Sequence, residues 1–145
     1  MKKLGHLNRD IARVLAGMGH TDSLVIADCG LPIPPGVECI DLALALGEPG
    51  FARVLETVLA DFQCERAVFA DECRAHNPAV VETAAALSRQ GVALEWVSHE
   101  AFKQRCQAAR VVIRTGECTP YSNITLMAGV TYGEAARASA RGTQG

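Results

Sequence analysis

The chain has 145 residues, of which 49% are hydrophobic and 21% are charged. That size and composition are typical of one soluble globular domain with its own core. Fourteen basic and sixteen acidic residues give a net charge of −2, which argues against a nucleic-acid-binding protein with its usual basic face. No stretch approaches the roughly 18 consecutive apolar residues of a membrane span, and we expect no membrane partner.

Six cysteines are spread along the chain, and the basic N-terminus has no apolar stretch of a signal peptide behind it. A chain of this length does not need disulfides, so we expect reduced thiols in a cytoplasmic protein. There is no Cys-x-x-Cys pair, which argues against structural zinc. The mean hydropathy of +0.13 is slightly apolar for a small chain and is consistent with a buried subunit interface.

Helical and extended patterns alternate along the first half of the chain. We predict a helix from Asn8 to Met18, strands over 23–27 and 40–46, and a helix from Pro49 to about Gln63. The first strand is a short apolar run, and the second is predicted because leucines alternate with Asp and Ala. Residues 31–36 contain three prolines, which remove N–H donors and fix φ, so this segment is predicted to be irregular.

The second half continues the alternation. We predict strands over 67–70, 92–97, 111–113 and 124–127, and helices over 77–90 and 98–108. Asn77 and Pro78 form a helix start, and Gly91 is the matching stop. Ser98 opens the last helix, and residues 133–145 are expected to form a flexible tail after a single domain over 1–132.

Strands that alternate with helices predict an α/β domain. We expect a three-layer α/β/α arrangement in which a central, mostly parallel sheet is covered by helices on both faces. In open sheets of this kind, ligands bind beyond the strand ends. Three predicted loops follow strands here, over 28–36, 71–77 and 114–123.

A histidine and two carboxylates lie about the two ends of the first strand. His20 and Asp22 precede the strand, and Asp28 follows it. His20 comes after a helix end, whose negative dipole favours protonated histidine, and a nearby carboxylate acts in the same direction. Such a histidine is suited to proton donation. The alternative is that Asp22 only caps or pairs with His20 in a turn.

The segment from Arg114 to Asn123 is the second candidate. Glu117, Tyr121, Ser122 and Asn123 supply donors and acceptors for a polyhydroxylated ligand. The alternative is a tight turn with the tyrosine packed on its neighbours. A third candidate is His99, at a predicted helix start just after a strand. Its alternative is a partly exposed residue of the first turn.

Other kinds of site have weak support. The phosphate-loop and dinucleotide motifs are absent, and so is the Gly-x-Ser-x-Gly elbow of a serine hydrolase. His76 with Asp71, Glu72 and Cys73 would place all metal ligands in one short segment, so we predict no metal site. We expect His6 to be exposed to solvent, and Cys29 to fill space in the protein rather than touch a ligand.

Three motifs taken together resemble the D-ribose pyranase family. They are Gly-His-Thr-Asp at 19–22, Asp-Cys-Gly-Leu-Pro-Ile-Pro at 28–34 and Arg-Thr-Gly-Glu-Cys-Thr-Pro-Tyr-Ser-Asn at 114–123. Gly129–Tyr132 is similar to the usual end of that family, so the resemblance covers residues 1 to about 132. The related L-fucose mutarotase family shares the histidine and Tyr-x-Asn, but usually has Gly at Thr21 and lacks the Leu-Pro-Ile-Pro loop.

The resemblance implies the ribose pyranase-like α/β fold and a cofactor-free isomerase, or mutarotase, of ribose catabolism. Such an enzyme interconverts the pyranose and furanose forms, and the anomers, of D-ribose and supplies furanose to a ribokinase. The implied proton donor is His20. The implied substrate-binding residues are Asp28, His99, Tyr121, Ser122 and Asn123. The family also implies cytoplasmic homo-oligomers, pentameric rings stacked into a homodecamer, with sites between neighbouring subunits.

The chemistry needs only positioned acids and bases, because a proton goes to the ring oxygen while the anomeric hydroxyl loses one. Such catalysis contributes about 10²–10⁴-fold. Three alternatives stay open: a mutarotase of L-fucose or another sugar, a non-catalytic sugar-binding protein, and a glycosidase with Asp28 and Glu117 as its carboxylate pair. The presence of both His20 and Asp28 disfavours a mere binder, which needs no titrating acid.

Overall fold

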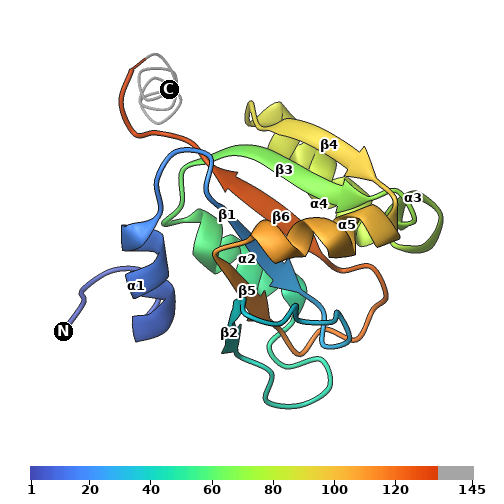
Figure 1. Cartoon of the computed structure of the whole chain (residues 1–145), viewed down its shortest axis with the longest axis horizontal. Helices are drawn as coiled ribbons and strands as arrows, with labels where there is room; N and C mark the ends of the chain where they lie inside the picture. The colour runs from blue at the N-terminus through green and yellow to red at the C-terminus, as the bar shows by residue number, and fades with distance from the viewer. Residues whose placement is uncertain (134–145) are drawn as a thin grey trace.

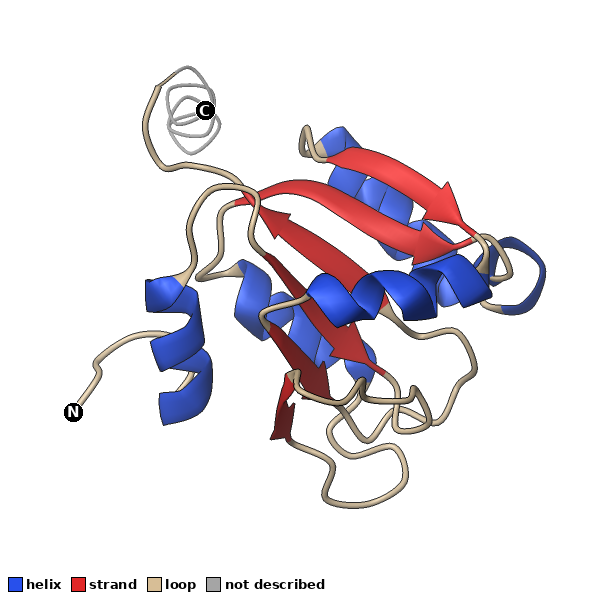
Figure 2. Cartoon of the chain, in the orientation of Figure 1, coloured by secondary structure: helices blue, strands red, loops and turns tan. Residues whose placement is uncertain are grey.

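The computed structural model describes residues 1–133, which form one six-stranded sheet with the order β2-β5-β1-β6-β3-β4 (Figure 1). The strands are β1 (Ser23–Ala27), β2 (Glu38–Asp41), β3 (Cys64–Ala70), β4 (Ala93–Val97), β5 (Val111–Arg114) and β6 (Ile124–Ala128). Only β6 is antiparallel to its neighbours, β1 and β3, as its reversed arrow in Figure 2 shows. The remaining pairs are parallel, which confirms the predicted mostly parallel sheet.

Helices cover both faces of this sheet. The helices are α1 (Arg9–Gly17), α2 (Phe51–Leu59), α3 (Cys73–His76), α4 (Pro78–Arg89) and α5 (His99–Arg105), followed by the 3-10 turn η1 (Cys106–Ala108). One core cluster joins α1, α2 and α4 to the face of β1 that carries Leu24 and Ile26. The other joins α5 and η1 to Val25 and Ala27 on the opposite face. Figure 1 shows α5 in front of the sheet and α2 and α4 behind it, which confirms the three layers.

Local capping explains where three helices begin. The Asn8 side chain accepts hydrogen bonds from the backbone N–H groups of Asp10 and Ile11, at 3.0 and 2.9 Å. Asn77 and Ser98 cap α4 and α5 in the same way, as predicted. These bonds satisfy N–H groups that have no partner within the helix, so polar residues at these positions fix the helix starts.

The predicted strand over 40–46 is wrong beyond Asp41. The Asp41 carboxylate accepts the N–H of Ala43 at 3.0 Å, and the chain turns back at Gly47, where φ is +85°. Leu44 and Leu46 consequently lie 82% and 81% exposed. The alternation of leucines therefore reflects a surface loop with apolar side chains. A side chain at Gly116 would overlap the Ala45 and Glu48 carbonyl oxygens of this loop, so glycine permits the loop to dock.

Three smaller differences concern two helices and His6. The second helix ends at Leu59 rather than near Gln63, and α3 occupies the predicted loop over 71–77. The side chain of His6 is 6% exposed and its Nε2 lies 3.4 Å from Asp61, which corrects the expectation that it is solvated. The predicted tail lies, apart from Gly133, outside the described residues. Within residues 1–133 no helix is long and apolar enough to cross a membrane.

Candidate functional site

A cleft of about 390 Å³ lies beyond the carboxyl ends of the parallel strands. Its walls come from the loops after β1 and β5 and from the start of α5. The lining residues are Asp28, Cys29, Gly30, Leu31, His99, Glu117, Cys118, Pro120 and Tyr121. Three of the predicted substrate-binding residues, Asp28, His99 and Tyr121, therefore share one cleft, because their strands are parallel and end at the same edge of the sheet.

The Asp28 carboxylate is held in place from behind. Asn123, which is 1% exposed, accepts the backbone N–H of Asp28 at 2.8 Å and donates to its Oδ2 at 3.1 Å. The backbone N–H of Gly30 donates to Oδ1 at 3.0 Å. A carboxylate oxygen accepts more than one hydrogen bond, so both oxygens keep capacity for hydroxyl groups in the cleft. Asn123 lies behind the cleft wall and fixes the orientation of Asp28.

Ser122 also lies behind the cleft rather than in it. Its buried hydroxyl accepts a hydrogen bond from the side-chain amide of Asn77 at 2.9 Å. The same amide donates to the Pro120 carbonyl at 2.9 Å, and the Cys73 thiol donates to the Tyr121 carbonyl at 3.1 Å. The loop that carries Tyr121 is thereby anchored to the junction of α3 and α4, and Tyr121 itself is held at a positive φ of +63°.

Two histidines flank the Tyr121 ring. The His99 ring meets it edge-on, with centroids 5.1 Å apart, and the His76 ring lies 5.8 Å away. The backbone N–H of His99 donates to Glu72 Oε2 at 2.7 Å, which fixes the start of α5 relative to α3. The Nδ1 atom of His99 is buried and has no hydrogen-bond partner within the described part of the chain. This half-buried imidazole thus lies in the cleft wall, with its Nδ1 atom shielded from the cleft by the protein.

Glu117 lines the cleft but its carboxylate is occupied by the protein. Oε1 accepts the N–H of Phe51 at 3.1 Å, and Oε2 accepts the N–H and hydroxyl of Thr119 at 3.2 and 2.9 Å. Burial alone would raise the pKa of Glu117, but these donors outweigh it and hold the pKa below its usual value. An ionised carboxylate does not donate a proton, and one whose two oxygens are held by protein donors is a poor nucleophile, so the arrangement argues against Glu117 as either member of a glycosidase carboxylate pair.

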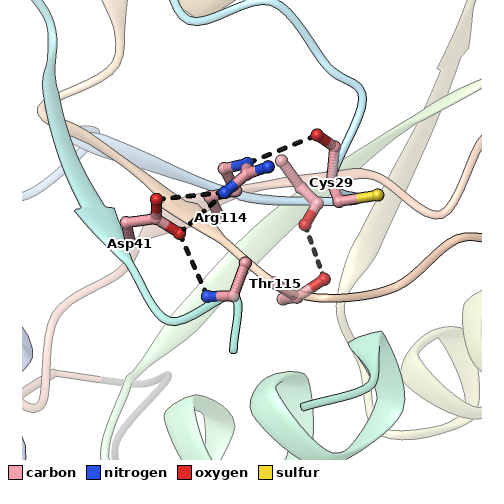
Figure 3. Close-up of polar contacts among 6 residues, drawn as sticks. Cys29, Asp41, Arg114 and Thr115 are labelled. Carbon is pink, nitrogen blue, oxygen red and sulfur yellow. Dashed lines mark hydrogen bonds and ion pairs between the residues drawn. The ribbon is translucent and has the colours of Figure 1, made fainter. Parts of the chain in front are cut away.

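Arg114 ties the loop after β1 to the end of β2 (Figure 3). Its guanidinium donates to both carboxylate oxygens of Asp41, at 3.1 and 3.0 Å, and to the Cys29 carbonyl at 3.3 Å. The N–H of Ala43, together with Arg114, holds the pKa of Asp41 below its usual value although burial opposes this. The thiol of Cys29 points away from Arg114 in Figure 3, and Cys29 lines the cleft.

His20 lies at the opposite end of the strands from the cleft. It precedes β1, whereas Asp28 follows it, and a five-residue strand that rises about 3.3 Å per residue separates the two ends by roughly 16 Å. Instead, His20 Nε2 contacts Glu65 Oε2 at 2.6 Å. Asp22 does not bind the His20 ring in this turn, because its Oδ2 accepts the Gly19 N–H at 2.9 Å. Within one copy, the structure does not bring His20 to Asp28.

Three residues shape these two regions without a signal in the local sequence. Asn77 is predicted only as a helix cap, although it also anchors the cleft loop. Glu72 and Glu65 were given no role at the histidines that they contact, because no local motif connects a glutamate to a histidine 27 or 45 positions away. Among residues 1–133 no cluster of three or more side chains is suited to hold a metal ion.

Residues 1–131 match the sequence profile of the RbsD / FucU transport protein family. A D-ribose pyranase of Chromobacterium violaceum is 73% identical over 132 residues, and one of Laribacter hongkongensis is 58% identical; each alignment covers 91% of this chain and 100% of the relative. The structure of Bacillus subtilis RbsD complexed with D-ribose is 43% identical, with a TM-score of 0.87 over 91% of this chain and 100% of that one. The chain is therefore a member of the RbsD / FucU family.

Proposed function

We infer that this chain is an isomerase that interconverts the pyranose and furanose forms of D-ribose. The observation that carries this inference is the similarity to D-ribose pyranases along the whole matched domain, at 73% and 58% identity. The fold agrees closely with that of Bacillus subtilis RbsD, whose structure holds D-ribose. Similarity to a fucose mutarotase from Streptococcus pneumoniae is only 21% and supports the fold alone, so L-fucose is the less supported substrate.

The cleft around Asp28 is the proposed ribose site. Asp28 presents a fixed carboxylate that accepts hydrogen bonds from sugar hydroxyls, and His99, which lines the same cleft, offers its Nε2 atom to another hydroxyl. The Tyr121 ring offers a flat apolar wall against which a sugar ring packs. Asn123 and Ser122 support the site from behind, by orienting Asp28 and by fixing the loop of Tyr121.

His20 completes the site from a neighbouring copy of the chain. Within one copy, the length of β1 separates His20 from Asp28. Proton donation by His20 therefore requires that the carboxyl ends of the parallel strands in one copy meet the opposite end of the sheet in another copy. The half-exposed His20 ring and the exposed Leu44 and Leu46 leave surface for such contacts. A ring of copies satisfies this head-to-tail geometry for every site at once, and we propose pentameric rings paired as a decamer in the cytoplasm.

The proposed reaction needs no electron transfer. Protonated His20 gives a proton to the ring oxygen of ribopyranose, while the anomeric hydroxyl loses its proton to a base in the cleft, a role that we assign to the Asp28 carboxylate. The bond between the anomeric carbon and the ring oxygen breaks and leaves the open-chain aldehyde. Attack by a different hydroxyl on that aldehyde, with the proton transfers reversed, closes the furanose ring.

Saturation-transfer NMR on D-ribose with catalytic amounts of protein tests the function. We expect exchange between pyranose and furanose signals to rise in proportion to protein concentration. Asp28→Asn should lower that exchange at least about 100-fold, whereas the exposed control Asp10→Asn should leave it unchanged. If ribose bound but its exchange were not accelerated, the chain would be a binding protein. If L-fucose exchanged faster than D-ribose, the proposed substrate would be wrong.

A further inference from the structure

The backbone around His20 is fixed from several sides. Thr21 has a φ of +71°, which is unusual for a β-branched residue and persists only where the surroundings impose it. The N–H of Thr21 donates to the Ala128 carbonyl at 2.8 Å, and the N–H of Ala128 donates back to the Asp22 carbonyl at 2.8 Å. The Asp22 carboxylate and backbone close the turn onto Gly19. Only rotation of the ring is left to place the nitrogens of His20.

Glu65, at the start of β3, makes the contact that sets this rotation. Its Oε2 lies 2.6 Å from His20 Nε2, and both side chains are about half exposed, at 50% and 52%. An ionised carboxylate only accepts hydrogen bonds, so Nε2 must carry the proton in this contact. The other nearby carboxylate, that of Asp22, is bound to the Gly19 N–H. The nitrogen left for another molecule is therefore Nδ1.

Gly129 explains why the Glu65 side chain can lie in this position. A Cβ atom at residue 129 would come within 3.2 Å of Glu65 Cβ and 3.6 Å of Glu65 Oε2. The N–H of Gly129 also donates to the Gln63 carbonyl at 2.9 Å, which keeps the end of β6 against the start of β3. Because Gly129 has no side chain, there is room for the Glu65 carboxylate next to the imidazole.

We propose that Glu65 is a positioning residue, which keeps a proton on Nε2 of His20 and so makes Nδ1 the atom that exchanges protons with the sugar. This assignment rests on the proposed function. The imidazolium gives the Nδ1 proton to the ring oxygen and becomes the neutral tautomer that retains Nε2–H. Nδ1 recovers a proton when the new ring closes, and the Glu65 carboxylate stabilises the imidazolium in between.

NMR of protein with ¹⁵N-labelled histidine tests the contact without reference to activity. We expect, at low temperature where exchange with solvent is slow, a ring N–H signal that correlates with Nε2 of one histidine and is shifted downfield by its bond to the carboxylate. His20→Ala should remove this signal and thereby assign it. Glu65→Ala should abolish it, Glu65→Asp should retain it in weakened form, and the exposed control Glu82→Ala should leave it intact. A signal that is unchanged in Glu65→Ala would overturn the proposal.

Kinetics of ribose exchange separates positioning from a structural role. Glu65→Ala should lower exchange at saturating ribose about 10- to 100-fold, the effect of one charge-assisted hydrogen bond, while ribose affinity changes less than about threefold. Glu65→Asp should recover part of the rate. In a His20→Ala background Glu65→Ala should cost nothing further, because it acts through His20. A further loss of rate when Glu65→Ala is added to His20→Ala would contradict the assignment, and so would a wild-type rate in Glu65→Ala alone. If the unaltered protein did not accelerate exchange, the proposed function would fail, and the NMR signal would still decide the contact.

Discussion

Asn77 connects the stability of the fold to the geometry of the cleft. It is buried, its Oδ1 caps α4 by accepting the Val80 N–H at 3.2 Å, and its amide nitrogen donates to the Pro120 carbonyl and the Ser122 hydroxyl. Asn77→Ala removes all three bonds, whereas Asn77→Asp keeps an oxygen for the cap and removes both donated bonds. The two variants therefore separate capping from anchoring of the loop.

The expected magnitudes follow from these bonds. Loss of a cap costs about 1 kcal/mol, and leaving buried acceptors without their donor costs about 1–3 kcal/mol, so Asn77→Ala should lower the free energy of unfolding by about 2–4 kcal/mol. Asn77→Asp keeps the cap, and its charge suits a helix N-terminus, but a buried carboxylate oxygen then faces the Pro120 carbonyl, so the loss should be at least that of the two donated bonds. Both variants should bind ribose several-fold more weakly, since the loop of Tyr121 loses its anchor.

Urea unfolding at one fixed protomer concentration measures the stability of both variants. With a slope of about 2 kcal/mol per molar, the midpoint of Asn77→Ala should fall by about 1–2 M. The control Thr83→Ala, which removes an exposed hydroxyl from the same helix, should change the midpoint little. A loss below about 0.5 kcal/mol in Asn77→Ala, or wild-type stability in Asn77→Asp, would show that the bonds of Asn77 do not stabilise the fold.

Three further predictions concern pH, thiols and assembly. Because the pKa of Glu117 is lowered in the fold, its ionised form stabilises the protein above the unfolded pKa of 4.5. Urea midpoints should therefore show that the unaltered protein is more stable than Glu117→Gln, by an amount that is constant near neutral pH and shrinks as the pH falls below 4.5. A difference that grew in acid would contradict the lowered pKa of Glu117. Burial raises the pKa of three thiols, those of Cys64, Cys73 and Cys106, to about 11. Mass spectrometry after iodoacetamide treatment should therefore show these three cysteines unmodified. The exposed Cys118 should be modified, and more slowly when ribose is bound. Leu44→Ser with Leu46→Ser should shift the protein to smaller species in size-exclusion chromatography with little loss of helix content, and an unchanged elution volume would place the interface elsewhere.

Much of the fold was predictable because its signals are local. Asn8, Asn77 and Ser98 each cap a helix through a bond that spans two or three residues, and such bonds leave a short sequence pattern. The ligand site of an open sheet was predicted beyond the strand ends, and Asp28 and Tyr121 do line one cleft there. The resemblance to a known family supplied the substrate, which the pattern of polar residues alone did not.

The remaining features depend on contacts that leave no local pattern. Leu44 and Leu46 alternate like strand residues, and periodicity cannot distinguish a buried face from an exposed apolar loop. The pairing of Glu65 with His20 joins β3 to the turn before β1, and the strand that lies between them in the sheet is β6, the last in the chain. No single segment of sequence carries that arrangement.

We propose that each site takes its cleft from one copy of the chain and its His20 from another. Mixed oligomers of His20→Ala and Asp28→Asn, formed by unfolding and refolding the two together, test it directly by saturation-transfer NMR on D-ribose. Each variant alone should be nearly inactive, whereas random mixing in equal amounts should restore about a quarter of the wild-type exchange, because one site in four unites an intact cleft with an intact His20. Mixtures as inactive as the separate variants, beside an active wild-type protein refolded in the same way, would contradict a shared site.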